Sequence, residues 1–107
     1  MRIIFLRNER CTAWKTAREE LKLALAKLKL KEEVEEKVMI TQEEAERYRF
    51  LGSPTILING EDIDLSIEEK EKEYSPDTCR IYFFQGEYHE YPPMEMIIDA
   101  LKKHITT

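Results

Sequence analysis

The pattern of apolar and polar residues predicts short buried strands that alternate with amphipathic helices. Residues Arg2 to Leu6 form an apolar run with β-branched side chains, which is typical of a strand buried on both faces. From Thr12 onward, apolar residues recur every three or four positions, and charged residues fill the opposite face. We therefore predict a long amphipathic helix directly after the first strand. Its apolar stripe comprises Trp14, Ala17, Leu21, Ala24, Leu25 and Leu28.

A second strand and a short helix follow the long helix. Apolar residues in the segment from Val34 to Ile40 indicate the strand. Thr41 is followed by Glu44 three residues later, which is the signature of a capping box at the start of a helix. Because glycine commonly follows the last turn of a helix, we predict that this short helix ends at Gly52.

The next segment predicts a β-hairpin. Two runs typical of strands, Thr55 to Ile58 and Glu61 to Leu65, are separated by Asn59-Gly60. Asn-Gly between two such runs is the strongest short-range hairpin signal, because both residues of the turn must adopt positive φ angles. We therefore expect these two strands to pair in antiparallel fashion.

The last third of the chain predicts another hairpin and a closing helix. Residues Arg80 to Phe84 and Glu87 to Tyr91 flank Gln85-Gly86, which gives the pattern of a second hairpin. Pro92-Pro93 ends this hairpin, because proline cannot donate a hydrogen bond to a strand ladder. The apolar spacing from Met94 to Ile105 then predicts an amphipathic helix.

The predicted order of elements is β-α-β-α-β-β-α, with the additional hairpin before the last helix. A strand that returns through a helix to a parallel neighbour, followed by an antiparallel hairpin and a helix, places helices on both faces of a mixed sheet. We therefore predict an α/β fold in which helices flank a four-stranded mixed sheet. A length of 107 residues is that of one domain, which we expect to cover residues 1–107.

Composition and charge restrict the classes of partner. The net charge of -5 argues against nucleic acid, whose phosphates would be repelled by the average field of the protein. No stretch approaches the ~20 consecutive apolar residues of a membrane helix, and the chain begins with a strand pattern instead of a signal peptide. Two cysteines are too few for a secreted disulfide scaffold. We therefore predict a cytoplasmic protein whose cysteines are thiols, with no membrane partner.

The segment between the two hairpins is strongly acidic. Residues 61–73 contain seven acidic side chains among thirteen positions, with Lys70 and Lys72 as the only basic ones. Runs of like charge are usually solvated, so we expect residues 62–73 to form a loop or a polar helical turn. An acidic binding site is the less favoured alternative.

Two motifs resemble those of glutaredoxins and thioredoxins. Cys11 lies at the junction of the first strand and the first helix, where these families keep the amino-terminal cysteine of their CxxC motif. The run from Gly52 to Ile56, followed by Asn59-Gly60, resembles the cis-proline segment and hairpin of the same families. The resemblance implies a thioredoxin-like fold, a cis Ser53-Pro54 peptide bond and a position for this bond beside Cys11.

A wider set of residues resembles a group of little-characterised thioredoxin-like proteins of prokaryotes, for which the resemblance implies no particular activity. The set comprises Gly52-Ser53-Pro54, Asn59-Gly60, Cys79-Arg80-Ile81-Tyr82, Gly86 and Pro92-Pro93.

The chain departs from the CxxC motif at its second cysteine, where Trp14 stands instead. Without a resolving thiol at this position, a mixed disulfide at Cys11 cannot be released by the usual intramolecular attack. The resemblance therefore implies a monothiol redox protein with Cys11 as the catalytic residue. Its partner would be a thiol-bearing peptide or protein, or glutathione, and we predict no other cofactor.

The same resemblance suggests which residues bind the substrate. Backbone groups of Ser53 and Pro54 would hold an extended thiol-bearing peptide, because such edges bind peptides by main-chain hydrogen bonds. Arg7 or Arg10 would bind its carboxylate. Trp14 opens the apolar stripe of the helix, so we favour a core position for it over stacking on a ligand.

The reactivity of Cys11 is open at this stage. The positive end of the helix dipole and the neighbouring Arg10 would stabilise a thiolate there. The alternative is that Cys11 is a relic retained for packing, in a fold that has lost its chemistry and serves as an interaction domain. Trp14 and the tyrosines at 82, 88 and 91 would then form a partner or homodimer patch.

Cys79 has no counterpart in the CxxC motif, and we expect a buried structural cysteine. If the first hairpin returns toward the end of the sheet that carries Cys11, the two thiols could instead form a disulfide or a soft-metal site. His89 and His104 have no spacing to Cys11 that defines a metal site, so none is predicted. His104 is expected to interact with the dipole of the last helix.

Overall fold

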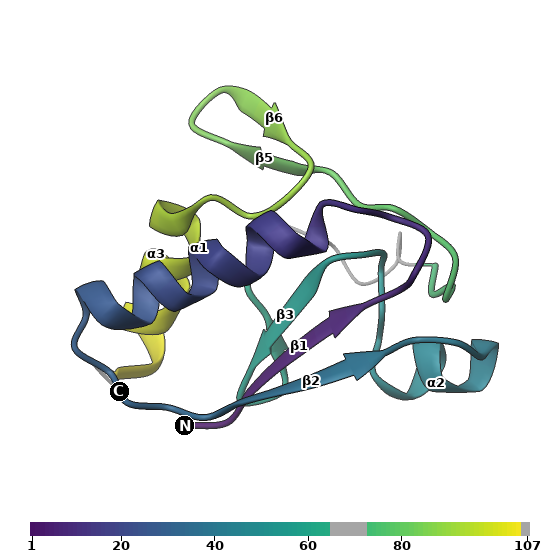
Figure 1. The fold of residues 1–107 in the computed structure, drawn as a ribbon, viewed down its shortest axis with the longest axis horizontal. Coiled ribbons are helices and arrows are strands. Elements are labelled where there is room, and N and C mark those ends of the chain that lie inside the picture. Colours follow the sequence, from purple (N-terminus) through teal and green to yellow (C-terminus); the bar gives the residue numbers. More distant parts are fainter. Residues whose placement is uncertain (65–72, 106–107) are drawn as a thin grey trace.

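The computed structural model describes residues 1–64 and 73–105 and has a mixed α/β architecture (Figure 1). Within these ranges a four-stranded sheet, three helices and a separate two-stranded hairpin are present. In chain order the elements are β1 (Ile3–Arg7), α1 (Trp14–Lys27), β2 (Val34–Val38), α2 (Gln42–Arg47), β3 (Thr55–Ile58), β4 (Glu61–Asp62), β5 (Tyr82–Phe84), β6 (Glu87–His89) and α3 (Met94–Ile105). The predicted mixed sheet and its helices are confirmed.

The sheet has the strand order β2-β1-β3-β4, with β1 at its centre. β1 runs parallel to β2, with Ile3 opposite Val34, and antiparallel to β3, with Ile3 opposite Ile58. The four residues from Ile3 to Leu6 are buried, as predicted for a strand covered on both faces. The antiparallel partner β4 continues from β3 through Asn59 and Gly60, which adopt φ angles of 53° and 81°.

Helices cover both faces of this sheet. α1 and α3 lie together on one face, and α2 lies by the other (Figure 1). The larger core joins Phe5 and Ile56 of the sheet to Leu21 of α1 and Leu101 of α3. Burial of these apolar side chains is the main force that holds the layers together. The smaller core on the opposite face contains Ile4, Leu6, Met39, Ala45, Phe50 and Leu57.

The start of α2 agrees with the sequence, but its end does not. Thr41 and Glu44 form the predicted capping box, in which each side chain bonds the backbone amide of the other. The helix ends at Arg47, not at Gly52, because the chain reverses through Arg49 in a left-handed conformation with a φ of 54°. The amide of Phe50 then bonds the carbonyl of Ala45. Gly52 therefore has another role, which is described below.

Other boundaries shift by one or a few residues. α1 begins at Trp14 instead of Thr12, because residues 12–13 form a turn that leads from Cys11 into the helix. β4 ends at Asp62, short of the predicted boundary, because the amide of Asp64 bonds the side chain of Asp62 instead of a neighbouring strand. Leu65 and most of the acidic segment, residues 65–72, lie outside the described residues.

The second hairpin forms its own small sheet. β5 and β6 pair in antiparallel fashion around Gln85 and Gly86, whose φ angles are 52° and 80°. Both strands are shorter than predicted but lie within the predicted ranges. The hairpin lies beside the start of α3, where Gln85 bonds Glu95 (Figure 1). None of the helices in the described part of the chain is long and apolar enough to cross a membrane.

Candidate functional site

Cys11 and Cys79 are joined by a disulfide, with their Cα atoms 5.8 Å apart across 68 residues of sequence. Cys79 is therefore not the separate, buried structural cysteine that we expected. It is exposed to solvent, and the alternative in which the two cysteines form a pair describes the structure. The Ser53-Pro54 peptide bond beside this pair is cis, as the resemblance implied.

Backbone pairing brings Cys79 to the end of the sheet. The amide of Ser53 donates to the carbonyl of Thr78 at 2.8 Å, and the amide of Arg80 donates to the carbonyl of Ser53 at 3.1 Å. Residues Ser53 and Cys79 thus form an isolated parallel bridge. The backbone of Ser53, which we expected to hold an external peptide, is occupied by the chain itself. A peptide could bind this edge only by displacing residues 78–80.

Gly52 is required by the close approach of these two segments. Its φ of 144° lies in a region that side chains rarely adopt. A Cβ atom at this position would lie 2.9 Å from the Cβ of Arg80 and 3.1 Å from the carbonyl carbon of Cys79. The glycine therefore lets the segment that carries Cys79 lie directly against the cis-proline turn.

Asn8 connects three segments around the disulfide. It is 3% exposed, and its Oδ1 accepts hydrogen bonds from the amides of Arg10 at 3.2 Å and Cys11 at 3.0 Å. Its Nδ2 donates to the carbonyls of Pro76 at 2.9 Å and Thr78 at 3.1 Å. Its own amide donates to the Ser53 hydroxyl oxygen at 3.1 Å. The side-chain bonds of Asn8 thus hold both cysteine-bearing segments in one geometry.

Sequence reasoning missed Asn8 as a site residue. The available signal was its place between the buried first strand and Cys11, where an asparagine commonly bonds the backbone of a turn. Its second set of partners, at Pro76 and Thr78, comes from far along the chain and has no local signal.

Replacing Asn8 with Ala is expected to lower the free energy of unfolding by about 2 kcal/mol, because buried amides and carbonyls lose their partners. The variant should also bring Cys11 and Cys79 together less effectively, so the reduced protein should reoxidise more slowly in air-free buffer containing oxidised glutathione. Urea unfolding and a time course of thiol content measure the two effects. Asn8→Asp retains the acceptor for Cys11 but places a carboxylate oxygen against the carbonyls of Pro76 and Thr78, so it should reoxidise no faster than Asn8→Ala. Unchanged stability and reoxidation in Asn8→Ala would show that Asn8 does not position the pair.

Arg80 anchors the residue next to Cys79 in the protein interior. It is 6% exposed, and its guanidinium donates to both carboxylate oxygens of Asp62, at 2.7 and 2.8 Å. It also donates to the hydroxyl oxygen of Thr55 at 3.0 Å and lies 4.3 Å from the centre of the Tyr82 ring. Such a bidentate pair fixes both distance and orientation. Asp62 therefore links the strand β4 to the segment of Cys79.

Tyr82 completes this buried cluster. Its hydroxyl donates to the carbonyl of Pro54 at 2.5 Å, and its side chain is fully buried. Burial raises the pKa of the Tyr82 hydroxyl far above its usual range, so the group stays a neutral donor. Burial alone would lower the pKa of Arg80, but the hydrogen bonds and the negative charge of Asp62 oppose this effect and the pKa is raised. Because Tyr82 is buried, it does not belong to the exposed tyrosine patch that we considered for partner binding.

An open hollow of about 360 Å³ borders the disulfide. It brings together three of the predicted site residues, Cys11, Arg10 and Ser53, with Cys79. Arg10 is exposed at this site, whereas Ser53 and Pro54 are buried. The full lining is Arg10, Cys11, Thr12, Ala13, Ser53, Cys79, Arg80, Ile81 and Glu90.

Arg7 and Trp14 are held in a different arrangement. The guanidinium of Arg7 lies 4.0 Å from the centre of the Trp14 ring and bonds Glu36 at 3.2 Å. Arg18 lies 4.7 Å from the same ring and bonds the same carboxylate at 2.7 Å. Trp14 packs against the larger core, as we favoured. Neither Arg7 nor Trp14 lines the hollow beside the disulfide.

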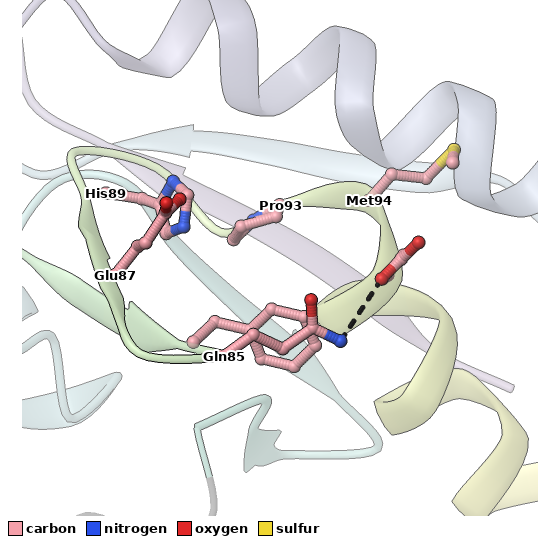
Figure 2. Close-up of a pocket in the computed structure, with 7 residues that line it drawn as sticks. Gln85, Glu87, His89, Pro93 and Met94 are labelled. Atoms are coloured by element: carbon pink, nitrogen blue, oxygen red, sulfur yellow. Dashed lines mark hydrogen bonds between the residues drawn. The ribbon is translucent and has the colours of Figure 1, made fainter.

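A second hollow, of about 300 Å³, lies between the β5-β6 hairpin and the beginning of α3 (Figure 2). Gln85, Glu87 and His89 line it from the hairpin, and Pro93 and Met94 line it from the segment that enters the helix. The side-chain amide of Gln85 donates to a carboxylate oxygen of Glu95, in the first turn of α3, at 3.3 Å, and the dashed line marks this bond. Neither cysteine lines this hollow, so it carries no thiol chemistry.

The histidines do not belong to a metal site in the described part of the chain. Among residues 1–64 and 73–105, no group of three or more histidine, cysteine, aspartate or glutamate side chains could hold a metal ion. His104 lies in the last turn of α3 with Lys102 and Lys103, the end at which a helix dipole favours positive charge. Its Nδ1 lies 3.4 Å from the amide nitrogen of the Asn59 side chain.

These observations define a small mixed α/β domain with a cysteine pair at one end of its central sheet, beside a cis-proline turn and an open hollow. The chain belongs to the family described as Domain of unknown function (DUF2703), which matches residues 5–101. The matched range includes both cysteines, Asn8, Gly52 and Arg80. No curated protein and no solved structure matches the chain.

Proposed function

We propose that this protein is a thioredoxin-like thiol–disulfide redox protein whose working pair is Cys11 and Cys79. The observation that carries the proposal is the disulfide between them at the edge of an open hollow. The order of elements and the cis Ser53-Pro54 bond near Cys11 support the thioredoxin-like part of the proposal. Cys79 supplies the second thiol that the CxxC position lacks, so a strictly monothiol mechanism is not required.

The proposed chemistry is a cycle of thiol–disulfide exchange. In the reduced protein, the thiolate of one cysteine attacks a substrate disulfide, forms a mixed disulfide and releases the first substrate thiol. The other cysteine then attacks the mixed disulfide, releases the second substrate thiol and closes the Cys11–Cys79 bond. Two thiols of glutathione or of a donor protein reduce this bond again and become oxidised themselves. Each complete cycle transfers two electrons from donor to substrate.

The surroundings of the pair favour small or protruding substrates. The backbone of Ser53 is paired with Thr78 and Arg80, so an extended peptide has no free strand edge there. The exposed Arg10 guanidinium at the hollow would attract a carboxylate, as glutathione carries. The proposed substrates are therefore glutathione mixed disulfides or a cysteine that protrudes from a partner protein. We place the protein in the cytoplasm, where disulfides are usually transient and catalytic or redox-sensing.

Catalytic turnover with glutathione tests this proposal. Wild-type protein is expected to reduce a small disulfide repeatedly when reduced glutathione, glutathione reductase and NADPH are supplied, and NADPH consumption measures the rate. Cys11→Ser and Cys79→Ser are each expected to lose the intramolecular step, because neither retains two thiols. Both variants are compared with reduced wild-type protein in thermal unfolding, so that loss of activity is separated from loss of folding.

Two outcomes would contradict the proposed function. A Cys11–Cys79 bond that excess glutathione and thioredoxin both fail to open in the folded protein would be a structural disulfide. Full turnover in Cys79→Ser would instead identify a monothiol mechanism that depends on Cys11 alone.

A further inference from the structure

The two sulfur-bearing residues of the pair differ strongly in their access to solvent. Cys11 is 7% exposed, and its amide is held by the Oδ1 of Asn8 at 3.0 Å. Cys79 is exposed, and it follows the exposed residues Asp77 and Thr78 at the surface. Thiol–disulfide exchange requires the incoming thiolate to reach one particular sulfur, so access selects the sulfur that is attacked. The exposed member of this pair is Cys79.

A thiolate that leaves at Cys11 is formed in a largely buried position, which disfavours its charge. Cys11 lies three residues before α1, a helix of 14 residues, at the end where the dipole favours negative charge. The structure describes α1 in full, and its first turn contains no acidic residue that would oppose this effect. The helix dipole offsets part of the cost of burying the Cys11 thiolate, and access at Cys79 decides the direction of attack.

We infer that Cys79 is the residue that exchanges with outside partners, and that Cys11 is the buried thiol that leaves and later resolves. This inference rests on the proposed function and reverses the order that the resemblance implied, in which Cys11 would attack first. During reduction, a glutathione thiolate bonds to the Cys79 sulfur, the disulfide breaks, and its electron pair remains on the Cys11 sulfur. A second glutathione thiolate then attacks the glutathione sulfur, which releases oxidised glutathione and the Cys79 thiolate.

The reverse direction follows the same order. The Cys79 thiolate attacks a substrate disulfide and forms a mixed disulfide at the surface, where the substrate does not have to enter the core. The Cys11 thiolate then attacks the Cys79 sulfur and displaces the substrate thiolate. Asn8 acts as a positioning residue for this second step, because it bonds the amide of Cys11 and the carbonyl of Thr78.

Trapping the mixed disulfide tests which sulfur is attacked. Oxidised wild-type protein is mixed briefly with reduced glutathione, the free thiols are blocked with iodoacetamide, and peptides are analysed by mass spectrometry. Glutathione is expected on the Cys79 peptide and the alkyl group on the Cys11 peptide. Glutathione found mainly on Cys11 would overturn the inference while leaving the redox cycle itself intact.

Single-cysteine variants provide a second measurement that does not depend on opening the disulfide. In native buffer, Cys79 in Cys11→Ser is expected to react with oxidised glutathione roughly tenfold faster, or more, than Cys11 in Cys79→Ser. The difference should disappear in urea, because unfolding exposes both thiols equally. Equal native rates, or a faster Cys11, would overturn the order. If the Cys11–Cys79 pair of wild-type protein does not cycle but Cys79 is the faster single thiol, the proposed function fails. The assignment of Cys79 as the residue that exchanges with outside partners then still stands.

Discussion

Replacing Arg80 with Met is expected to lower the free energy of unfolding by about 3 kcal/mol or more, because it leaves Asp62 without its buried partner. The side chain of Asp62 is only 15% exposed, and the Arg80 side chain that it loses is 4% exposed. Thr55 and Tyr82 lose a contact in the same step. Urea unfolding of the reduced and the oxidised protein measures the change in both redox states.

Two further variants make this expectation specific to the buried pair. Arg47→Met removes an exposed arginine from α2 and should change stability by less than about 0.5 kcal/mol. In Arg80→Met combined with Asp62→Leu, no charge is left unpaired, so the double variant should be less destabilised than the sum of the two single changes. Additive losses would show that the two charges are not coupled.

Replacing Gly52 with Ala is expected to lower the free energy of unfolding by about 3 kcal/mol and to disturb the cysteine pair. The new Cβ would lie 2.9 Å from the Cβ of Arg80, a distance that side chains do not tolerate, and 3.1 Å from the carbonyl carbon of Cys79, which would have to move slightly. The φ of 144° adds backbone strain for any residue other than glycine. The segment 78–80 must therefore shift away from Ser53. We expect the disulfide to become easier to reduce, as measured by equilibration with glutathione buffers of defined ratio.

Gly86→Ala is the matched control for Gly52→Ala. Gly86 also has a positive φ angle, of 80°, but a Cβ there would meet nothing within 4 Å. The control variant therefore has backbone strain but no steric clash, and its free energy of unfolding should fall by about 1 kcal/mol. It should also leave the reduction of the disulfide unchanged. If Gly52→Ala behaves like Gly86→Ala in both measurements, the close approach at Gly52 does not position Cys79.

The parts of this protein that were predictable depend on neighbours in sequence. The Thr41–Glu44 capping box and the Asn59-Gly60 turn are made by residues that are at most three positions apart. Their side-chain chemistry and φ preferences determine the local structure before any other part of the chain is placed. The apolar spacing of α1 and the buried run of β1 likewise predicted which faces enter the core.

The errors arose where a local signal competed with a distant contact. Gly52 after a short helix is a common helix end, but here a left-handed residue at Arg49 ends the helix earlier. The glycine is used instead for contact with the backbone of Cys79, which is far away in sequence. A tyrosine-rich hairpin suggested a surface patch, but Tyr82 is buried by its bond to Pro54 and its contact with Arg80.

The sequence by itself determined the alternation of strands and helices, the first hairpin, and the position of Cys11 between the first strand and the first helix. Only the tertiary structure decided that Cys79 joins Cys11, because the chain between β4 and Cys79 carries no periodic pattern that directs its path. The position of Cys79 is set by three contacts made at once: Ser53 with the 78–80 backbone, Asn8 with Thr78, and Arg80 with Asp62. Each contact joins residues that are distant in sequence, and its free energy is gained only after the loop between them has closed.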